Sequence, residues 1–164
     1  MNQNQINNKI TEQERLGREQ FNHVCQRERW CRVHKFSKNK MARWDVSFFE
    51  NNQPVIGDIK KRRYECTTFN DWYFEVEKAE ALIELAKQYG ENTKIGYIHL
   101  FEDNIMWVWT FTKEQIEKLE AKMVQVQKND WSNELVWKKV YCLNSAQATR
   151  KEEINLNNSI FKKH

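Results

Sequence analysis

The chain has 164 residues, enough for one domain with a real core, and seven Trp, nine Phe and five Tyr residues can fill that core. Charged residues make up 30% of the sequence and the mean hydropathy is −0.91. No apolar run approaches the ~18 residues of a membrane span, so we expect a cytoplasmic protein without a membrane partner. The net charge of +4 permits a nucleic-acid partner without demonstrating one.

The N-terminal third predicts a disordered start followed by a helix. Residues 1–10 are rich in Asn and Gln and are expected to be disordered. A helix is predicted from Thr11 to about Trp30, because Thr11 and Glu14 fit a capping box. Gly17 weakens that prediction, since glycine costs a helix interior ~1 kcal/mol relative to alanine. The run HKFSKNKMAR (34–43) then carries four basic residues and no acid.

A β-hairpin is predicted next, with arms at 42–49 and about 54–63 joined by the polar turn ENNQ. Side chains alternate along a strand. One face of the second arm therefore carries Val55, Gly57 and Ile59, and the other carries Ile56, Asp58 and Lys60. The arm ends in four consecutive cations, KKRR.

The remaining elements complete a mixed pattern. Residues 69–90 predict a regular helix, and residues 94–111 predict a second hairpin around EDN. A third helix is predicted from about 112 to 128, followed by a strand at 135–143. The order α-β-β-α-β-β-α-β indicates a single α/β or α+β domain over residues 11–145, with a polar tail at 146–164.

The chemistry is concentrated on the first hairpin. Asp58 and Lys60 share one strand face, and strand pairing can bring Asp45 of the neighbouring arm close to Asp58. Two neighbouring carboxylates repel each other, and a divalent cation such as Mg²⁺, which prefers oxygen ligands, relieves that repulsion. A lysine beside the ion can orient a metal-bound water or stabilise charge on a phosphate. The three residues thus form a candidate phosphodiesterase site.

Asp45, followed after twelve residues by Asp-Ile-Lys, resembles the motif of the PD-(D/E)xK nuclease superfamily, which includes restriction endonucleases and Holliday-junction resolvases. Trp44 stands where the motif has proline, and Asp58 where glutamate is more usual. The resemblance implies a restriction-endonuclease-like αβββαβ core, with a mixed central sheet flanked by helices. It also implies hydrolysis of DNA with Mg²⁺, or Mn²⁺ as a substitute, bound by Asp45 and Asp58.

The resemblance extends to further positions. Family members often carry a helical glutamate before the first acid, which implies Glu19 here, with Glu14 as the rival. Many also carry a polar or basic residue on the helix after the D-x-K strand, where this chain offers Glu75 and Lys78. Phosphate contacts are expected from the basic runs, at Lys38, Lys40, Lys61, Arg62 and Arg63. A resolvase or a palindrome-cutting enzyme would also need two sites and hence a homodimer.

Other interpretations of these residues stay open. Asp45 could pair with Arg43 or Lys61, leaving Asp58 and Lys60 as solubilising surface charges. A non-catalytic nucleic-acid-binding or protein-interaction module on the same fold is the alternative function. Two further motifs have a structural and a functional interpretation: a zinc site drawn from His23, Cys25, Cys31 and His34, and a base-stacking surface at MWVWTF (106–111), which is also the pattern of a buried strand.

Overall fold

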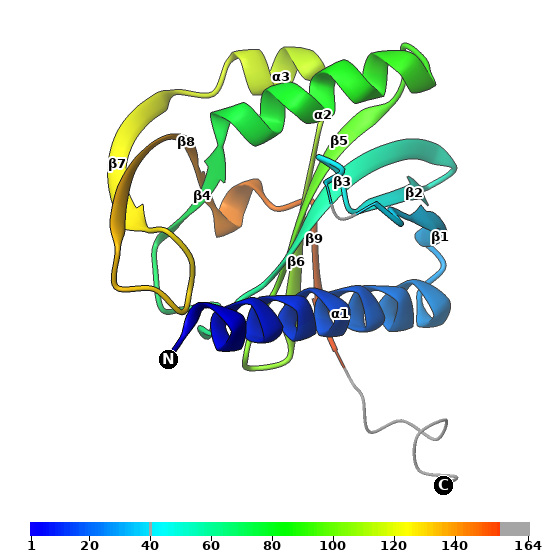
Figure 1. Ribbon diagram of the computed structural model, residues 1–164. Coiled ribbons are helices and arrows are strands. Elements are labelled where there is room, and N and C mark those ends of the chain that lie inside the picture. The colour runs from blue at the N-terminus through cyan, green and yellow to red at the C-terminus, as the bar shows by residue number, and fades with distance from the viewer. Residues whose placement is uncertain (40, 155–164) are drawn as a thin grey trace, which may run out of the picture.

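The computed structural model describes residues 1–39 and 41–154. Its centre is a six-stranded sheet, with helix α1 (Gln3–Arg27) on one face and helix α2 (Val76–Tyr89) on the other (Figure 1). A smaller, three-stranded sheet lies beside α2, at the left of the view. The predicted general class, a domain that combines helices with a mixed β-sheet, is confirmed. None of the helices in the described ranges combines the length and apolar character needed to cross a bilayer.

The central sheet is mixed. Its spatial order is β1-β2-β3-β5-β6-β9. The strands are β1 (Cys31–Phe36), β2 (Val46–Glu50), β3 (Gln53–Lys61), β5 (Lys94–Leu100), β6 (Ile105–Phe111) and β9 (Arg150–Glu153). Only β3 and β5 pair in parallel, and α2 lies on the crossover between them. Such a connection is the usual way to join parallel neighbours.

The predicted first hairpin is present as β2 and β3, but its first arm begins at Val46 rather than at residue 42, so Asp45 precedes the strand instead of lying near its middle. The two strands pair from Val46 opposite Gly57 to Glu50 opposite Gln53. Asn51 and Asn52 form the turn with φ of 47° and 68°, the left-handed conformation that asparagine tolerates and that two-residue hairpin turns need. Strand β1, which extends the hairpin, was not predicted, because its first residues continue the helical pattern of α1.

Three predicted boundaries are wrong. The segment predicted as one helix over 69–90 begins with β4 (Asp71–Glu75), and the helix predicted over 112–128 is the short α3 (Lys113–Glu117) followed by β7 (Ala121–Gln127). Both strands pair with β8 (Leu135–Asn144), in the order β4-β8-β7. This pairing partner lies far along the chain, so local periodicity could not reveal it. The expected polar tail also contains structure, namely a 3-10 turn (Ser145–Gln147) and β9.

The N-terminus is helical rather than disordered. Helix α1 begins at Gln3, and its capping box is formed by Asn2 and Gln5 rather than by Thr11 and Glu14. The Gln3 side chain also donates a hydrogen bond to Asn7 one turn later (2.9 Å). These local hydrogen bonds stabilise the first turns of the helix, although the Asn- and Gln-rich composition of residues 1–10 predicted disorder.

Two apolar clusters hold the layers together. Phe21 and Val24 of α1 pack on Phe48, Val55 and other residues of one sheet face. On the opposite face, residues of α2 pack on Ile56, Tyr97 and Trp109, and the small sheet adds Phe74 and Trp72. The alternation along β3 thus places Ile59 toward α1 and Asp58 toward α2, as predicted.

Gly57 and Gly96 face each other where β3 and β5 run in parallel. A methyl group at Gly57 would lie 2.8 Å from the Gly96 carbonyl oxygen, which backbone pairing holds in place. We expect Gly57→Ala to lower the free energy of unfolding by ~2 kcal/mol, measured by urea denaturation. Gly17→Ala is the control, because its methyl group would meet side chains and no backbone atom, with Ile59 at 3.3 Å, Lys61 at 3.4 Å and Leu100 at 3.7 Å, and the helix would gain up to ~1 kcal/mol. Equal denaturation midpoints for the two variants would contradict this account.

Candidate active site

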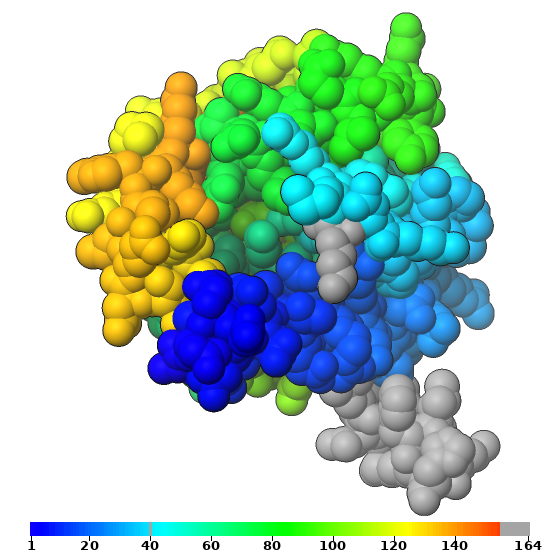
Figure 2. Space-filling model, in the orientation of Figure 1, coloured from blue at the N-terminus to red at the C-terminus, as the bar shows by residue number. Residues whose placement is uncertain are grey.

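A deep cleft of about 990 Å³ opens between α1, the end of β3 and the small sheet. Figure 2 shows it as a hollow between the blue surface of α1 and the orange surface around β8. The three predicted catalytic residues, Asp45, Asp58 and Lys60, all line this cleft.

Strand pairing brings the two acids together. Asp45 lies just before β2, and its N–H donates a hydrogen bond to the Gly57 carbonyl oxygen (2.9 Å), which sets its side chain beside Asp58. The Ile59 N–H donates to Asp45 Oδ2 at 2.8 Å. Asp58 is only 1% exposed, and its Oδ2 has no hydrogen-bond partner among the described residues. A buried carboxylate oxygen needs a compensating positive charge, and the Lys60 ammonium group lies 3.4 Å from Oδ2.

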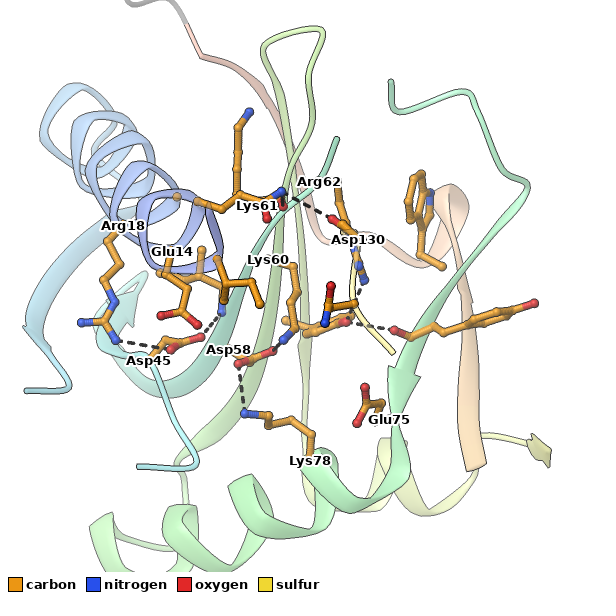
Figure 3. Close-up of a pocket in the computed structure, with 18 of the residues that line it drawn as sticks. Glu14, Arg18, Asp45, Asp58, Lys60, Lys61, Arg62, Glu75, Lys78 and Asp130 are labelled. Atoms are coloured by element: carbon orange, nitrogen blue, oxygen red, sulfur yellow. Dashed lines mark hydrogen bonds and ion pairs between the residues drawn. The ribbon is translucent and has the colours of Figure 1, made fainter. Parts of the chain in front are cut away.

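Two lysines approach Asp58 from opposite sides (Figure 3). Lys60 Nζ, from the same strand, lies 3.4 Å from Asp58 Oδ2, and Lys78 Nζ, from α2, lies 3.3 Å from Oδ1. The predicted proximity of Lys60 and Lys78 to the acids is therefore present. Because Asp58 is buried between two ammonium groups, its interpretation as a solubilising surface charge is wrong.

The environment gives the two acids opposite proton affinities. Burial, and after it the facing Asp58 carboxylate, raise the pKa of Asp45 to about 7. Burial would also raise the pKa of Asp58, but Lys60, Asp45 and Lys78 together hold that pKa low, at about 2. The Asp58 charge in turn raises the pKa of Lys60, which stays protonated. The site is thus a carboxylate that stays charged beside one that titrates near neutrality.

Helix α1 supplies Glu14 and Arg18, and not Glu19. Glu14, Gly17 and Arg18 share the helix face that lines the cleft. Arg18 Nη2 lies 3.3 Å from Asp45 Oδ1, so the partner of Asp45 is Arg18 rather than Arg43 or Lys61. The prediction of Glu19 is wrong, because its exposed carboxylate points away on another face and pairs with Arg15. Sequence reasoning missed Arg18, although its spacing of four from Glu14 was a usable signal.

Glu75 also lines the cleft but from a different element than predicted. It ends β4, just before α2, and its Oε1 accepts a hydrogen bond from Lys138 Nζ of β8 at 2.7 Å. Glu75 is thus paired with the small sheet rather than with the two acids. Lys138 had no signal in the sequence, because the β4–β8 pairing that places it is not local.

The predicted phosphate-binding residues divide into three groups. Lys38, Lys61 and Arg62 line the cleft, whereas Lys40 lies outside the described residues. Arg62 turns inward, with Nη2 3.3 Å from the Tyr97 hydroxyl, and Arg63 lies over the Trp131 ring at 3.7 Å. Arg62 and Arg63 therefore both make contacts within the protein, although Arg63 stays exposed, because the chain after β3 folds against the small sheet and its loop.

The remaining motifs have structural roles. Cys25 and Cys31 are buried free thiols in the apolar core beside α1, and their mutual hydrogen bond, followed by burial, raises the pKa of Cys25. The aromatic run of β6 is buried, with Trp109 fully enclosed, so its interpretation as a buried strand is confirmed. These residues fill the core and leave the cleft to the residues of α1, β3, α2 and the small sheet.

Asp45 and Asp58 are the residues that could hold a divalent cation. No group of three or more His, Cys, Asp or Glu side chains suited to a metal occurs within residues 1–39 and 41–154. A two-carboxylate site nevertheless suits Mg²⁺, which typically binds one or two carboxylates and completes its shell with water and substrate phosphate.

The raised pKa of Asp45 makes the acid pair costly to the folded protein at high pH. In the folded chain this carboxyl gives up its proton near pH 7, whereas in the unfolded chain its pKa is the ordinary value of 3.8. The unfolded state therefore binds fewer protons between these values, and this group's contribution to stability falls as the pH rises from 4 to 7. We expect Asp45→Asn in EDTA to raise the melting temperature more at pH 8 than at pH 5, relative to wild type.

The matched control is Asp71→Asn, at the exposed rim of the same cleft. Its effect on the melting temperature should be the same at both pH values. An equal effect of Asp45→Asn at pH 5 and pH 8 would show that burial and the facing Asp58 carboxylate do not raise the pKa of Asp45.

We compared the chain with protein-family models, with curated proteins and with solved structures, and none of the three comparisons gave a match.

Proposed function

We propose that this chain is a metal-dependent nuclease of the PD-(D/E)xK type that hydrolyses phosphodiester bonds in DNA. The observation that carries the proposal is the site on the β2–β3 hairpin. There, Asp45 and the buried Asp58 lie side by side, and the ammonium groups of Lys60 and Lys78 are within 3.4 Å of Asp58. Paired acids facing one opening have no use in a module that only binds phosphates, since they would repel them.

The arrangement of elements also supports this assignment. The order α1, β1, β2, β3, α2, β5 contains three strands between two helices and then a strand parallel to β3, with the short β4 inserted before α2. The αβββαβ core of the superfamily has this order. In both cases the first acid and the D-x-K sequence lie on the central hairpin.

The side chains suggest a division of roles. Asp45 and Asp58 would hold Mg²⁺, which when bound supplies Lewis-acid stabilisation of phosphate charge and a more acidic water. Lys60, whose side chain is 40% exposed, reaches from Asp58 toward the open cleft, so it would contact that water or the phosphate. Arg18 pairs with Asp45 from the α1 side, and Lys78 pairs with Asp58 from the α2 side.

The alternative function, a non-catalytic nucleic-acid-binding or protein-interaction module, has one observation in its favour. Lys60 and Lys78 already neutralise Asp58 without a metal ion. Under this alternative the acids and lysines would form a structural ion-pair network, and added metal would change nothing.

The test is cleavage of a mixed set of substrates, comprising supercoiled plasmid, linear duplex, single-stranded and branched DNA. We expect Mg²⁺ and Mn²⁺ to support cleavage, Ca²⁺ to support little turnover, and EDTA to abolish it. If folded protein cleaves no member of the set with either active metal, the nuclease proposal is wrong and the binding module becomes the better assignment.

A further inference from the structure

The cleft has walls on several sides of the catalytic acids. The face of α1 that carries Gln13, Gly17 and Arg18 forms one wall, and Tyr73, Lys138 and Val140 of the small sheet form another. Asp58 lies at the floor and is 1% exposed. We propose that this cleft accepts a single unpaired DNA strand rather than a double helix, an inference that rests on the proposed nuclease function for its choice of nucleic acid.

The loop between β7 and β8 closes one end of the cleft. Gln13 of α1 donates hydrogen bonds from Nε2 to the Lys61 carbonyl oxygen (2.8 Å) and to Asp130 Oδ2 (3.4 Å). The Trp131 Nε1–H donates to Gln13 Oε1 at 3.2 Å, and Arg63 covers the Trp131 ring. The tip of the small sheet is thus tied both to α1 and to the end of β3, which fixes the distance between the walls.

We expect these walls to keep a rigid DNA duplex from reaching Asp45 and Asp58. A volume of about 990 Å³ lies at the upper end of the range of small-molecule sites. A B-form duplex carries its phosphates on a wide convex surface, with a major groove alone ~12 Å across. Its phosphates would therefore meet the rims of the walls before reaching Asp58. A single strand can bend, so one of its phosphates can descend to the floor.

Aromatic rings in the cleft offer a contact that only unpaired bases can use. Trp44, Tyr64, Phe69 and Tyr73 line it, and Phe69 is 49% exposed although it is fully apolar. The Phe69 ring packs edge-on against the rings of Tyr64 (5.1 Å between centroids) and Trp72 (5.3 Å), and these contacts hold it in place. Bases of a duplex stack on one another, whereas bases of a single strand stack on side-chain rings.

The charge of the cleft suits a polyanion in spite of its acids. Nine basic and six acidic side chains of the described residues line it, so the lining is net positive. Lys38 is exposed. Lys61 is half-buried, next to the hydrogen bond that its carbonyl oxygen accepts from Gln13 of α1. Positive grooves with interleaved aromatic rings are the usual design for binding single strands.

The experiment measures binding of full-length wild-type protein by fluorescence anisotropy, in EDTA and at fixed salt. The probes are labelled oligo(dT) and a blunt hairpin duplex with the same number of nucleotides. We expect oligo(dT) to bind at least ~10-fold more tightly. Equal or tighter binding of the duplex would overturn the proposal, and this comparison needs no variant to fold.

A matched pair of variants tests the stacking contact. Phe69→Ala should weaken oligo(dT) binding by ~5- to 150-fold, the range for loss of one base-stacking ring. Tyr89→Ala is the control, because Tyr89 is 47% exposed, much like Phe69, but lies at the end of α2 away from the cleft. Circular dichroism checks folding, and Phe69→Leu, which keeps apolar bulk without a ring, replaces Phe69→Ala if that variant unfolds. Equal affinities for the Phe69 variant and Tyr89→Ala would overturn the stacking assignment.

The two proposals fail in different ways. Metal-dependent cleavage together with equal affinity for single strands and duplexes would overturn the single-strand assignment and leave the nuclease intact. Selective binding of oligo(dT) without metal-dependent cleavage of any DNA would support the single-strand cleft and overturn the nuclease.

Discussion

Replacing Lys60 with alanine should lower DNA cleavage by at least ~10²-fold while metal and DNA binding survive. Its ammonium group lies on the cleft side of Asp58, where it can contact a metal-bound water or the phosphate, but it supplies no ligand to the ion. Loss of a positioned proton-transfer or charge-stabilising group usually costs this much. Single-turnover cleavage at saturating Mg²⁺, with Mn²⁺ and DNA affinities measured separately, checks the expectation.

Two further lysines serve as comparisons. Lys94→Ala changes a half-buried lysine on the adjoining strand, at the end remote from the site, and should cleave like wild type. Lys78→Ala should show a smaller loss than Lys60→Ala, because Lys78 holds Asp58 from the α2 side and its side chain is less exposed (27%). Near-wild-type cleavage by folded Lys60→Ala protein would exclude the nuclease mechanism described above. A purely structural Lys60 would lower stability when removed, because the buried Asp58 would lose one of its two ammonium partners, and would leave the cleavage rate of the folded protein unchanged.

Asp58→Asn should abolish both metal binding and cleavage, with a loss of rate of at least ~10³-fold. The change removes the carboxylate that stays charged and leaves Asp45 as the one remaining carboxylate of the pair to hold the ion. Lewis-acid stabilisation of the phosphate amounts to several kcal/mol, so losing the ion costs orders of magnitude in rate. Calorimetric titration of Mn²⁺ into wild type and Asp58→Asn measures the first effect directly.

Asp71→Asn is the matched control for this experiment as well, because it removes an acid from the cleft rim and leaves the acid pair intact. Asp58→Asn also leaves Lys60 and Lys78 without their partner, so its melting temperature must be recorded to establish that the protein is folded. Equal Mn²⁺ binding by wild type and folded Asp58→Asn would contradict the assignment of Asp58 as a ligand.

The centre of the candidate site could be predicted because it depends on local rules. A two-residue period places Asp58 and Lys60 on one face, and a hairpin with an Asn-Asn turn fixes which residue of the first arm stands beside them. Lys78 was found because it follows within the next helix. These inferences needed only the alternation of a strand and the closure of a short turn.

The walls of the cleft could not be predicted for the same reason. Strands β4 and β7 exist because β8, distant in sequence, supplies their hydrogen bonds, and their aromatic and apolar residues fit helical spacing equally well. Lys138 and Trp131 reach the cleft only through this pairing. The N-terminal turns of α1 were missed because a polar composition outweighed the capping by Asn2 and Gln5.

The hydrogen bonds between Gln13 and the β7–β8 loop join two parts of the cleft that lie far apart in the sequence. Under the proposed function, one part carries the chemistry and the other governs which substrate enters. The charged groups described around the acid pair lie within residues 14–78, whereas β7, β8 and the loop that closes the cleft form one continuous stretch, residues 121–144. Under the proposed function, insertions or exchanges within that stretch would change which nucleic acids enter without altering the side chains around the acid pair. An engineer could therefore graft other loop tips between Gln127 and Leu135 to vary the substrate while keeping the same catalytic site.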